Sequence, residues 1–358
     1  MISTMRWFLQ AGTVVLALVA ALVPLAPQAV ERWYSTGLYP VVRGVLAPVS
    51  NLTPFAWLDV LSTGAAVAVL VVLARSVRRG WRDRRWRPVL TAVANLTTLA
   101  ALVYLVFLVA WGFNYRRVPM LERVALDGGA PTTAAVVALG TMAVGQLNAL
   151  HADAHATGWV TPWEDDDLRD AFGRVQRALS DAAPASPGRL KASLYGAYFR
   201  WTGVDGMVNP FGLEVIGNPD LLPIERPFVA AHEWAHLAGY ADESEASFVG
   251  WLTCVHGGAG PAYSAWLHLY WLIRAEIPAG ERPALADALA AGPRADLEAI
   301  AARLRRGQLP ALRIASQRVY DGYLRANRVG EGIRSYGLVI NLLLRARFEE
   351  EWVPVRRN

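Results

Sequence analysis

The chain has 358 residues, 54% of them hydrophobic, and its mean hydropathy is +0.25. This hydropathy is high for a wholly soluble protein, and the length allows membrane segments beside a sizeable folded domain. One basic stretch dominates the net charge of +5, and the single cysteine, Cys254, excludes an intrachain disulfide.

The first third of the chain contains three long hydrophobic runs. Each run has a stretch of fifteen or more residues without a charged side chain, and each is long enough to cross a bilayer. A cleavable signal peptide is the alternative for the first run, but residues 27–29 form a poor cleavage site and further runs follow. A buried helical hairpin is the alternative for the other two. We predict three transmembrane helices at about residues 8–30, 55–75 and 88–112.

A basic stretch separates the second and third runs, with seven arginines in the thirteen residues 75–87. Such a stretch with interleaved tryptophans can bind nucleic acid or anionic lipid. Because two spans flank it, we interpret it as a cytoplasmic loop that follows the positive-inside rule, and we predict no nucleic-acid partner. Residues 1–115 then form a membrane domain in the lipid bilayer. Residues 116–358 form an extracytoplasmic domain of a multi-pass protein of the cell membrane.

The extracytoplasmic part is predicted to be mainly helical. One Ala- and Val-rich helix at residues 132–155 carries His151 and His155, which are four residues apart. This spacing could hold a metal ion, but no glutamate lies between the two and no evident third ligand follows. We therefore interpret them as histidines that interact with the dipole at a helix C-terminus.

A small sheet is predicted just before residues 232–236, which carry the motif described next. The stretches 193–201 and 211–217 combine aromatic and β-branched residues with Gly, Asn and Pro at their boundaries. An edge strand at this place could hold an extended peptide through main-chain hydrogen bonds. The fold class is therefore mainly α, with three transmembrane helices and a helical domain that contains a small β-sheet.

The central motif is HEWAH at residues 232–236. On a helix, His232 and His236 share a face and can direct both imidazoles at one metal ion. Two imidazoles suit Zn²⁺, which then needs a third protein ligand and a water. Glu233 can act as general base towards that water. Pro227 suits the start of the helix and Gly239 the residue just past its end. The alternative is a buried helix whose histidines only form hydrogen bonds.

Three acidic residues shortly after the motif are candidates for the third ligand. On a helix that begins near Asp242, Glu243 shares a face with small residues at positions 246, 247 and 250. That face can pack closely against the motif helix, so we favour Glu243. Glu245 instead shares a face with larger apolar residues. Asp242 suits a metal ligand and a helix N-cap equally well.

Two resemblances follow from these residues. The run Glu243-Ser-Glu-Ala-Ser247 resembles the Glu-x-x-Ala/Ser-Asp run of gluzincin metallopeptidases, with Ser247 at the position of the aspartate. Further segments that carry a resemblance are Tyr39-Pro40, Trp111–Arg116, residues 232–247, Tyr320–Asn327 and Gly332–Tyr336. Through these segments, over nearly its full length, the chain is similar to a bacterial membrane family called domain of unknown function 3810. This resemblance implies a membrane-anchored, zinc peptidase-like protein and supplies no substrate.

We therefore predict a zinc metallopeptidase that hydrolyses peptide bonds, with a peptide or protein as substrate. His232, His236 and Glu243 bind Zn²⁺, and Glu233 is the general base. Tyr336 is the first candidate donor to the oxyanion, and the other candidates are Tyr320, Tyr323 and Arg334. The alternatives are an inactive zincin-like binding or scaffold protein of the envelope, and a zinc hydrolase of non-peptide amides.

Overall fold

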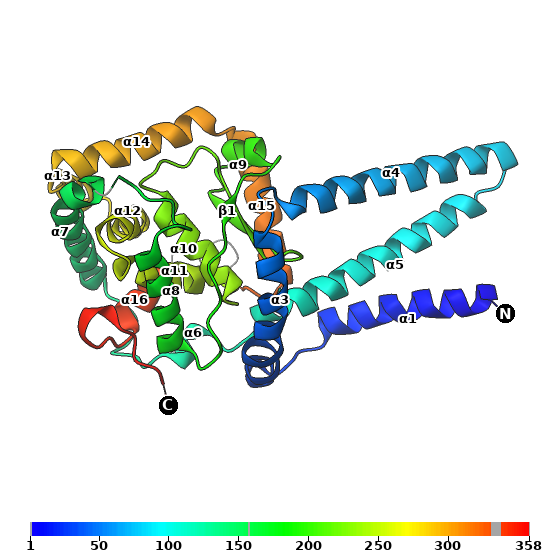
Figure 1. Cartoon of the computed structure of the whole chain (residues 1–358), viewed down its shortest axis with the longest axis horizontal. Coiled ribbons are helices and arrows are strands. Elements are labelled where there is room, and N and C mark those ends of the chain that lie inside the picture. The colour runs from blue at the N-terminus through cyan, green and yellow to red at the C-terminus, as the bar shows by residue number, and fades with distance from the viewer. Residues whose placement is uncertain (1, 157, 331–337, 358) are drawn as a thin grey trace.

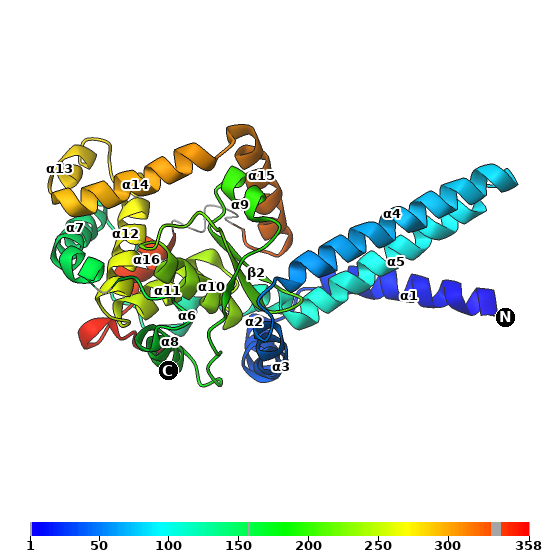
Figure 2. The ribbon, with the colours of Figure 1, turned by 45° about the horizontal axis from the view of Figure 1, so that its top comes forward.

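The computed structural model describes residues 2–156, 158–330 and 338–357. Figure 1 shows a rounded body from which long helices project together on one side. These are α1 (Ile2–Leu22), α4 (Trp57–Asp83) and α5 (Arg87–Ala110), and α5 packs against both of the others (Figure 2). The structure is mainly helical with one small sheet, as the sequence predicts.

Four helices of the described residues are long and apolar enough to cross a membrane: α1, α4, α5 and α7 (Thr133–Ala156). The first three expose large apolar side chains along their length, among them Leu16, Leu70 and Leu102. Helix α7 instead packs against α12 (Ala259–Glu276), on the side of the body opposite the projecting helices (Figure 1). The three N-terminal transmembrane helices remain a prediction, and α7 confirms the helix predicted at residues 132–155.

The prediction of a loop at residues 75–87 is wrong for most of its length. Helix α4 continues to Asp83, and α5 begins at Arg87 after a turn in which Arg84 has a φ of 48°. Arginine has a high helix propensity, so a run of arginines can extend an apolar helix beyond the apolar segment. The arginines therefore lie at the tip of the α4–α5 hairpin, far from the body (Figure 1).

The chain between α1 and α4 packs against the body. It contains α2 (Pro27–Ala29), the π-helix η1 (Val30–Leu38) and α3 (Tyr39–Asn51), and the 3₁₀-helix η2 (Gly112–Arg116) follows α5. Tyr39 and Trp111 are buried in the same hydrophobic cluster as Trp234 of the motif helix. The core of the body therefore includes residues from both sides of position 115.

The sheet has three strands in the order β1-β3-β2. Strand β1 (Leu190–Lys191) is parallel to β3 (Glu214–Gly217), and β2 (Gly206–Asn209) is antiparallel to β3, with Met207 opposite Ile216. Strand β2 is therefore an edge strand of the described sheet. The strand predicted at 211–217 is confirmed only for β3, because residues 210–213 form the turn that precedes it.

The strand predicted at residues 193–201 is wrong. Residues Gly196–Thr202 form helix α9, in which Gly196, Phe199 and Thr202 are buried. Burial at every third position matches one face of a helix and not the alternation of a strand. The aromatic residues that suggested a strand therefore belong to a short helix that connects β1 with β2.

Glu214 joins the sheet to the second projecting helix. Its buried carboxylate accepts hydrogen bonds from the backbone N–H groups of Trp57 (2.9 Å) and Leu58 (2.8 Å), the first residues of α4. Lys191, also fully buried, lies 2.9 Å from the same carboxylate. A negative charge is favourable at a helix N-terminus, so this ion pair anchors α4 to the sheet.

Helices α10 (Arg226–Leu237) and α11 (Glu243–Val255) form the centre of the body and pack against each other and against α12. Every residue of α10 from Pro227 to Leu237 is buried. The elements around them are α6 (Met120–Arg123), α8 (Asp166–Leu179), α13 (Arg282–Asp287), α14 (Ala291–Gly307), α15 (Pro310–Ala326), α16 (Leu338–Arg345) and the 3₁₀-helix η4 (Glu350–Trp352).

Candidate metal centre

Helix α10 holds the two histidines of the motif on one face. Pro227 occupies the first turn, where no intrahelical N–H bond is lost, and Gly239 follows the helix with a φ of +92° that favours glycine. The ring centroids of His232 and His236 are 4.8 Å apart. The i, i+4 spacing therefore brings the two rings together, as the sequence predicts.

Helix α11 supplies the third side chain of the cluster. Asp242 is the N-cap of α11, and its carboxylate accepts hydrogen bonds from the backbone N–H groups of Ser244 (2.9 Å) and Glu245 (3.3 Å). A Cβ atom at Gly250 would lie only 2.9 Å from the backbone nitrogen of His232. The small residue is therefore required for the close approach of α11 to α10, which brings Glu243 to the histidines.

The three side chains have the separations expected of ligands around one ion. Glu243 Oε2 lies 3.2 Å from His232 Nε2 and 3.4 Å from His236 Nε2. Ligands at tetrahedral angles about 2.05 Å from a zinc ion are roughly 3.3 Å apart. Glu243 Oε2 is buried, and among the described residues no donor meets it with good hydrogen-bond geometry. The donor set thus fits a metal ion such as Zn²⁺.

The distal nitrogen of each imidazole also has a partner. Tyr240 O lies 2.7 Å from His236 Nδ1, and Ser247 Oγ lies 3.3 Å from His232 Nδ1. Such contacts hold the rings with Nε2 directed into the cluster. Ser247 therefore contacts His232, although its side chain is shorter than the aspartate found at this position in gluzincins.

The general-base candidate Glu233 is buried beside the cluster. Its Oε2 atom has no hydrogen-bond partner among the described residues. A Cβ atom at Gly206, the first residue of β2, would lie 2.7 Å from Glu233 Oε1, so the edge strand passes directly against this carboxylate. Burial raises the pKa of Glu233, although the two nearby histidines partly oppose the shift. A raised pKa makes the carboxylate a stronger base towards a proton donor.

The electrostatics of Glu243 and His236 are coupled. Burial alone would raise the pKa of Glu243 and lower that of His236. Their mutual attraction outweighs burial, so the pKa of Glu243 lies well below its usual value and the pKa of His236 rises to about 9. The cluster without a metal ion therefore holds a proton on imidazole at neutral pH.

Glu245 and Asp242, the other two candidate ligands, lie away from the cluster. The Glu245 carboxylate accepts hydrogen bonds from the backbone N–H of Met120 (2.6 Å) and from Arg123 Nη2 (2.9 Å). It therefore links α11 to α6. Asp242 acts as the helix cap described above, which explains its position in the sequence without a metal.

Two of the four candidate oxyanion donors, Tyr320 and Tyr323, are among the described residues. Tyr320 of α15 donates a hydrogen bond to Glu243 Oε1, and Tyr323 stacks on Tyr320 with ring centroids 5.9 Å apart. Tyr320 therefore contacts the carboxylate of the cluster. Tyr336 and Arg334 lie outside the described residues.

Four supporting residues were missed in the sequence. Each donates a side-chain hydrogen bond to one of four consecutive carbonyl oxygens at and just past the C-terminus of α10, a place where carbonyls run out of partners within the helix. His236 O, the first of the four, also accepts a hydrogen bond from the backbone N–H of Gly239. The pairs are Trp111 to His236 O (3.0 Å), Tyr39 to Leu237 O (2.8 Å), Arg43 to Ala238 O (3.1 Å) and Arg117 to Gly239 O (2.9 Å). All four donors come from the first 117 residues, so the chain around the projecting helices fixes the end of the motif helix.

The fold and the cluster define a class of protein: a mainly helical body with a buried candidate metal centre and several apolar helices of membrane-spanning length. Residues 34–344 match the family model described as "Protein of unknown function (DUF3810)", and the chain belongs to this family. No curated protein and no solved structure matches the chain. The resemblance to this family in the sequence is thereby confirmed.

Proposed function

We propose that the protein is a membrane-anchored, zinc-dependent metallopeptidase. The observation that carries the proposal is the buried cluster of His232, His236 and Glu243 with Glu233 beside it. Binding a metal requires only the first three side chains. Hydrolysis also needs a general base, and the buried carboxyl group of Glu233, next to the edge strand β2, can act as one. The resemblance of residues 243–247 to gluzincins supports the same reading.

The chain's own residues would divide the chemistry among them. His232, His236 and Glu243 would hold the ion through three ligands and leave the fourth position of a tetrahedral site open. Zinc there supplies a water of lowered pKa and a Lewis acid for a carbonyl oxygen. Glu233 would accept the proton of the attacking water and pass it to the leaving nitrogen, a transfer that its raised pKa favours.

An extended peptide is the substrate that the surrounding backbone suits best. Strand β2 lies at the edge of the described sheet and passes against Glu233 at Gly206. A peptide that added itself to this edge would be held by main-chain hydrogen bonds, independently of its sequence. Its scissile carbonyl would then lie close to the general base.

We also propose an orientation in the cell membrane. Helices α1, α4 and α5 would span the bilayer, because they project together and expose apolar side chains. The arginines at the tip of the α4–α5 hairpin would be cytoplasmic, as the positive-inside rule requires. The body with the metal centre would then lie outside the cytoplasm.

The proposal is tested with the full chain in detergent, by zinc content and by cleavage of a fluorescent unfolded protein. Glu243→Gln should lose one zinc equivalent relative to wild type and all activity. Glu245→Gln should keep that equivalent, because Glu245 contacts Arg123 instead of the histidines. Glu233→Gln should keep zinc while its activity falls about 10²–10⁴-fold.

Two outcomes would contradict the proposal. Full activity in Glu233→Gln would exclude this mechanism. Normal zinc content without cleavage of any peptide or protein by the wild type would favour a binding protein of the envelope, or a hydrolase of non-peptide amides. Glu122→Gln, at an exposed position on α6, is the matched control, because it shows how much zinc and activity a Glu→Gln variant loses during purification alone.

A further inference from the structure

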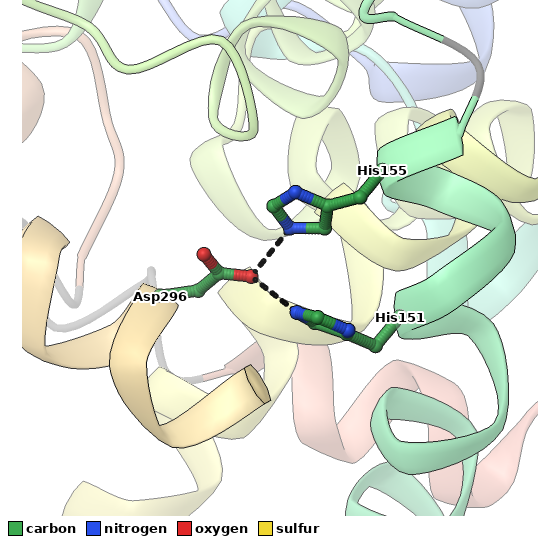
Figure 3. A group of neighbouring side chains, drawn as sticks. All are labelled: His151, His155 and Asp296. Atoms are coloured by element: carbon green, nitrogen blue, oxygen red, sulfur yellow. Dashed lines mark hydrogen bonds and ion pairs between the residues drawn. The ribbon is translucent and has the colours of Figure 1, made fainter. Parts of the chain in front are cut away.

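A second group of metal-binding side chains lies on a different part of the body. It consists of His151 and His155 from α7 and Asp296 from α14 (Figure 3). Asp296 Oδ2 lies 2.9 Å from His155 Nε2 and 3.5 Å from His151 Nε2. Both rings therefore point their Nε2 atoms at the same carboxylate oxygen, which is 141 residues from the nearer histidine in sequence.

We propose that these three residues form a second metal site that takes a divalent transition cation such as Zn²⁺ and joins α7 to α14. Two imidazoles and one carboxylate are a donor set for zinc and its neighbours in the first transition row, whereas Mg²⁺ and Ca²⁺ prefer oxygen ligands alone. The three ligand atoms lie within 4.8 Å of one another. The two carboxylate–imidazole separations, 2.9 and 3.5 Å, differ by only a few tenths of an ångström from the roughly 3.3 Å separation of ligands in a tetrahedral zinc site.

The surroundings hold the ligands in place as at a built site. The hydroxyl of Tyr263, from α12, donates a hydrogen bond of 2.6 Å to Asp296 Oδ2. Tyr263 is fully buried, and both histidine rings pack edge-on against its ring. Metal-binding carboxylates are commonly fixed by such second contacts. The carboxylate is therefore oriented towards the histidines by a third helix.

Gly292 has a specific role in this arrangement. A Cβ atom at this position would lie 2.4 Å from the ring of His151, so only glycine lets the first turn of α14 approach α7 so closely. On the other side, the ring of Trp159 packs edge-on against His155 at 5.4 Å. The two rings are thus confined between α14 and Trp159.

The site differs from the first centre in its access and its chemistry. The side chains of His151, His155 and Asp296 are 29%, 39% and 15% exposed, so solvent can complete the coordination of an ion. Asp153, between the two histidines, is two residues from each and faces away from them. The residue directly after the first histidine, where Glu233 stands in the first centre, is Ala152 here. A structural or regulatory ion that clamps two helices fits this geometry.

The test uses the full chain in detergent, freed of metal with a chelator and dialysed against Zn²⁺. Bound zinc is measured for wild type, His155→Ala, Asp296→Asn and Asp153→Asn. We expect His155→Ala and Asp296→Asn each to bind one equivalent less than wild type, and Asp153→Asn to bind as much as wild type. Because asparagine has nearly the same shape as aspartate, a loss of zinc in Asp296→Asn would reflect the missing carboxylate and not altered packing.

A second measurement separates this site from the first. In a Glu243→Gln background, Zn²⁺ should still raise the melting temperature, and His155→Ala should abolish this rise. Equal zinc content in His155→Ala and Asp153→Asn, with no difference in the melting shift, would overturn the proposal. Because the readouts are zinc content and melting temperature in a background without the first centre, the result is independent of any peptidase activity.

Discussion

At the scale of single residues, Gly206 controls the place of the general-base candidate. Gly206→Ala would put a methyl group 2.7 Å from Glu233 Oε1 and displace the carboxylate. We expect peptidase activity to fall about 10²-fold or more, because the proton transfer that it supports contributes 10²–10⁴-fold. Zinc content should not change, since the three ligands lie on α10 and α11. Loss of zinc together with activity would show that β2 supports the ligands instead. Gly280→Ala is the control, because a Cβ there meets no neighbouring atom.

The pKa of His236 predicts how zinc binding depends on pH. In the metal-free protein this pKa is raised to about 9, so the ring is protonated at neutral pH. A histidine must lose this proton before it can bind a metal ion. Zinc affinity should therefore rise about tenfold per pH unit from pH 7 to about 9 and then level off. Competition with a chelator of known affinity measures this in His155→Ala, which lacks the proposed second site.

The same shift affects the metal-free fold with a defined sign. The pKa of His236 is higher in the folded protein than in the unfolded chain, where it is 6.5. Protonation of this ring therefore stabilises the fold. The stabilisation is complete below pH 6.5 and is lost as pH rises through about 9. Zinc should therefore raise the melting temperature more at pH 9 than at pH 7. A zinc affinity that stays constant between pH 7 and 9 would contradict the raised pKa.

At the scale of elements, the C-terminus of α10 depends on donors from distant segments. Tyr39→Phe removes the hydroxyl that donates a hydrogen bond to Leu237 O, a buried carbonyl. An unsatisfied buried polar group costs about 1–3 kcal/mol. We expect this loss of stability in denaturant unfolding, with weaker zinc binding because His236 lies next to the affected carbonyl. Tyr198→Phe is the matched control, since its exposed hydroxyl forms a hydrogen bond with Ser316 and not with a buried carbonyl. Equal stability of the two variants would contradict the capping role.

The elements also show which sequence patterns are reliable guides to structure. The i, i+4 histidines of α10 and the N-cap Asp242 could be predicted, because helix periodicity and capping involve only neighbouring residues. Helix α9 could not, since its aromatic residues suit a strand or a helix and only burial at Gly196 and Phe199 distinguishes them. The sequence does not predict the extension of α4 to Asp83, because the arginines end the apolar stretch while their high helix propensity lets the helix continue.

At the scale of the whole molecule, the proposed orientation places the arginine-rich tip and the body on opposite sides of the membrane. Single cysteines in a Cys254→Ala background test this, because the native cysteine is buried. Asp153→Cys, on the body, should react with a membrane-impermeant maleimide in intact cells, whereas Arg82→Cys at the tip should react only after lysis. The reverse labelling pattern would place the metal centre in the cytoplasm.

The sequence by itself determined the features that depend on near neighbours. These are the long apolar helices, the placement of His232 and His236 on one face, and the mainly helical class. The preference for Glu243 over Glu245 also came from local spacing, because a helix face of small residues can approach another helix closely. The structure places Glu243 against both histidines, and Glu245 against Arg123.

Only the tertiary structure decided which distant residues meet. His151 and His155 had no evident third partner in sequence, yet α14 brings Asp296 to them across about 140 residues. The same is true of Tyr39, whose hydroxyl reaches the end of α10 from 198 residues away. Such partners are set by how whole helices pack, and packing depends on the shape of every side chain at the interface. Local periodicity therefore indicates the face that a residue occupies, and the packed fold determines what that face contacts.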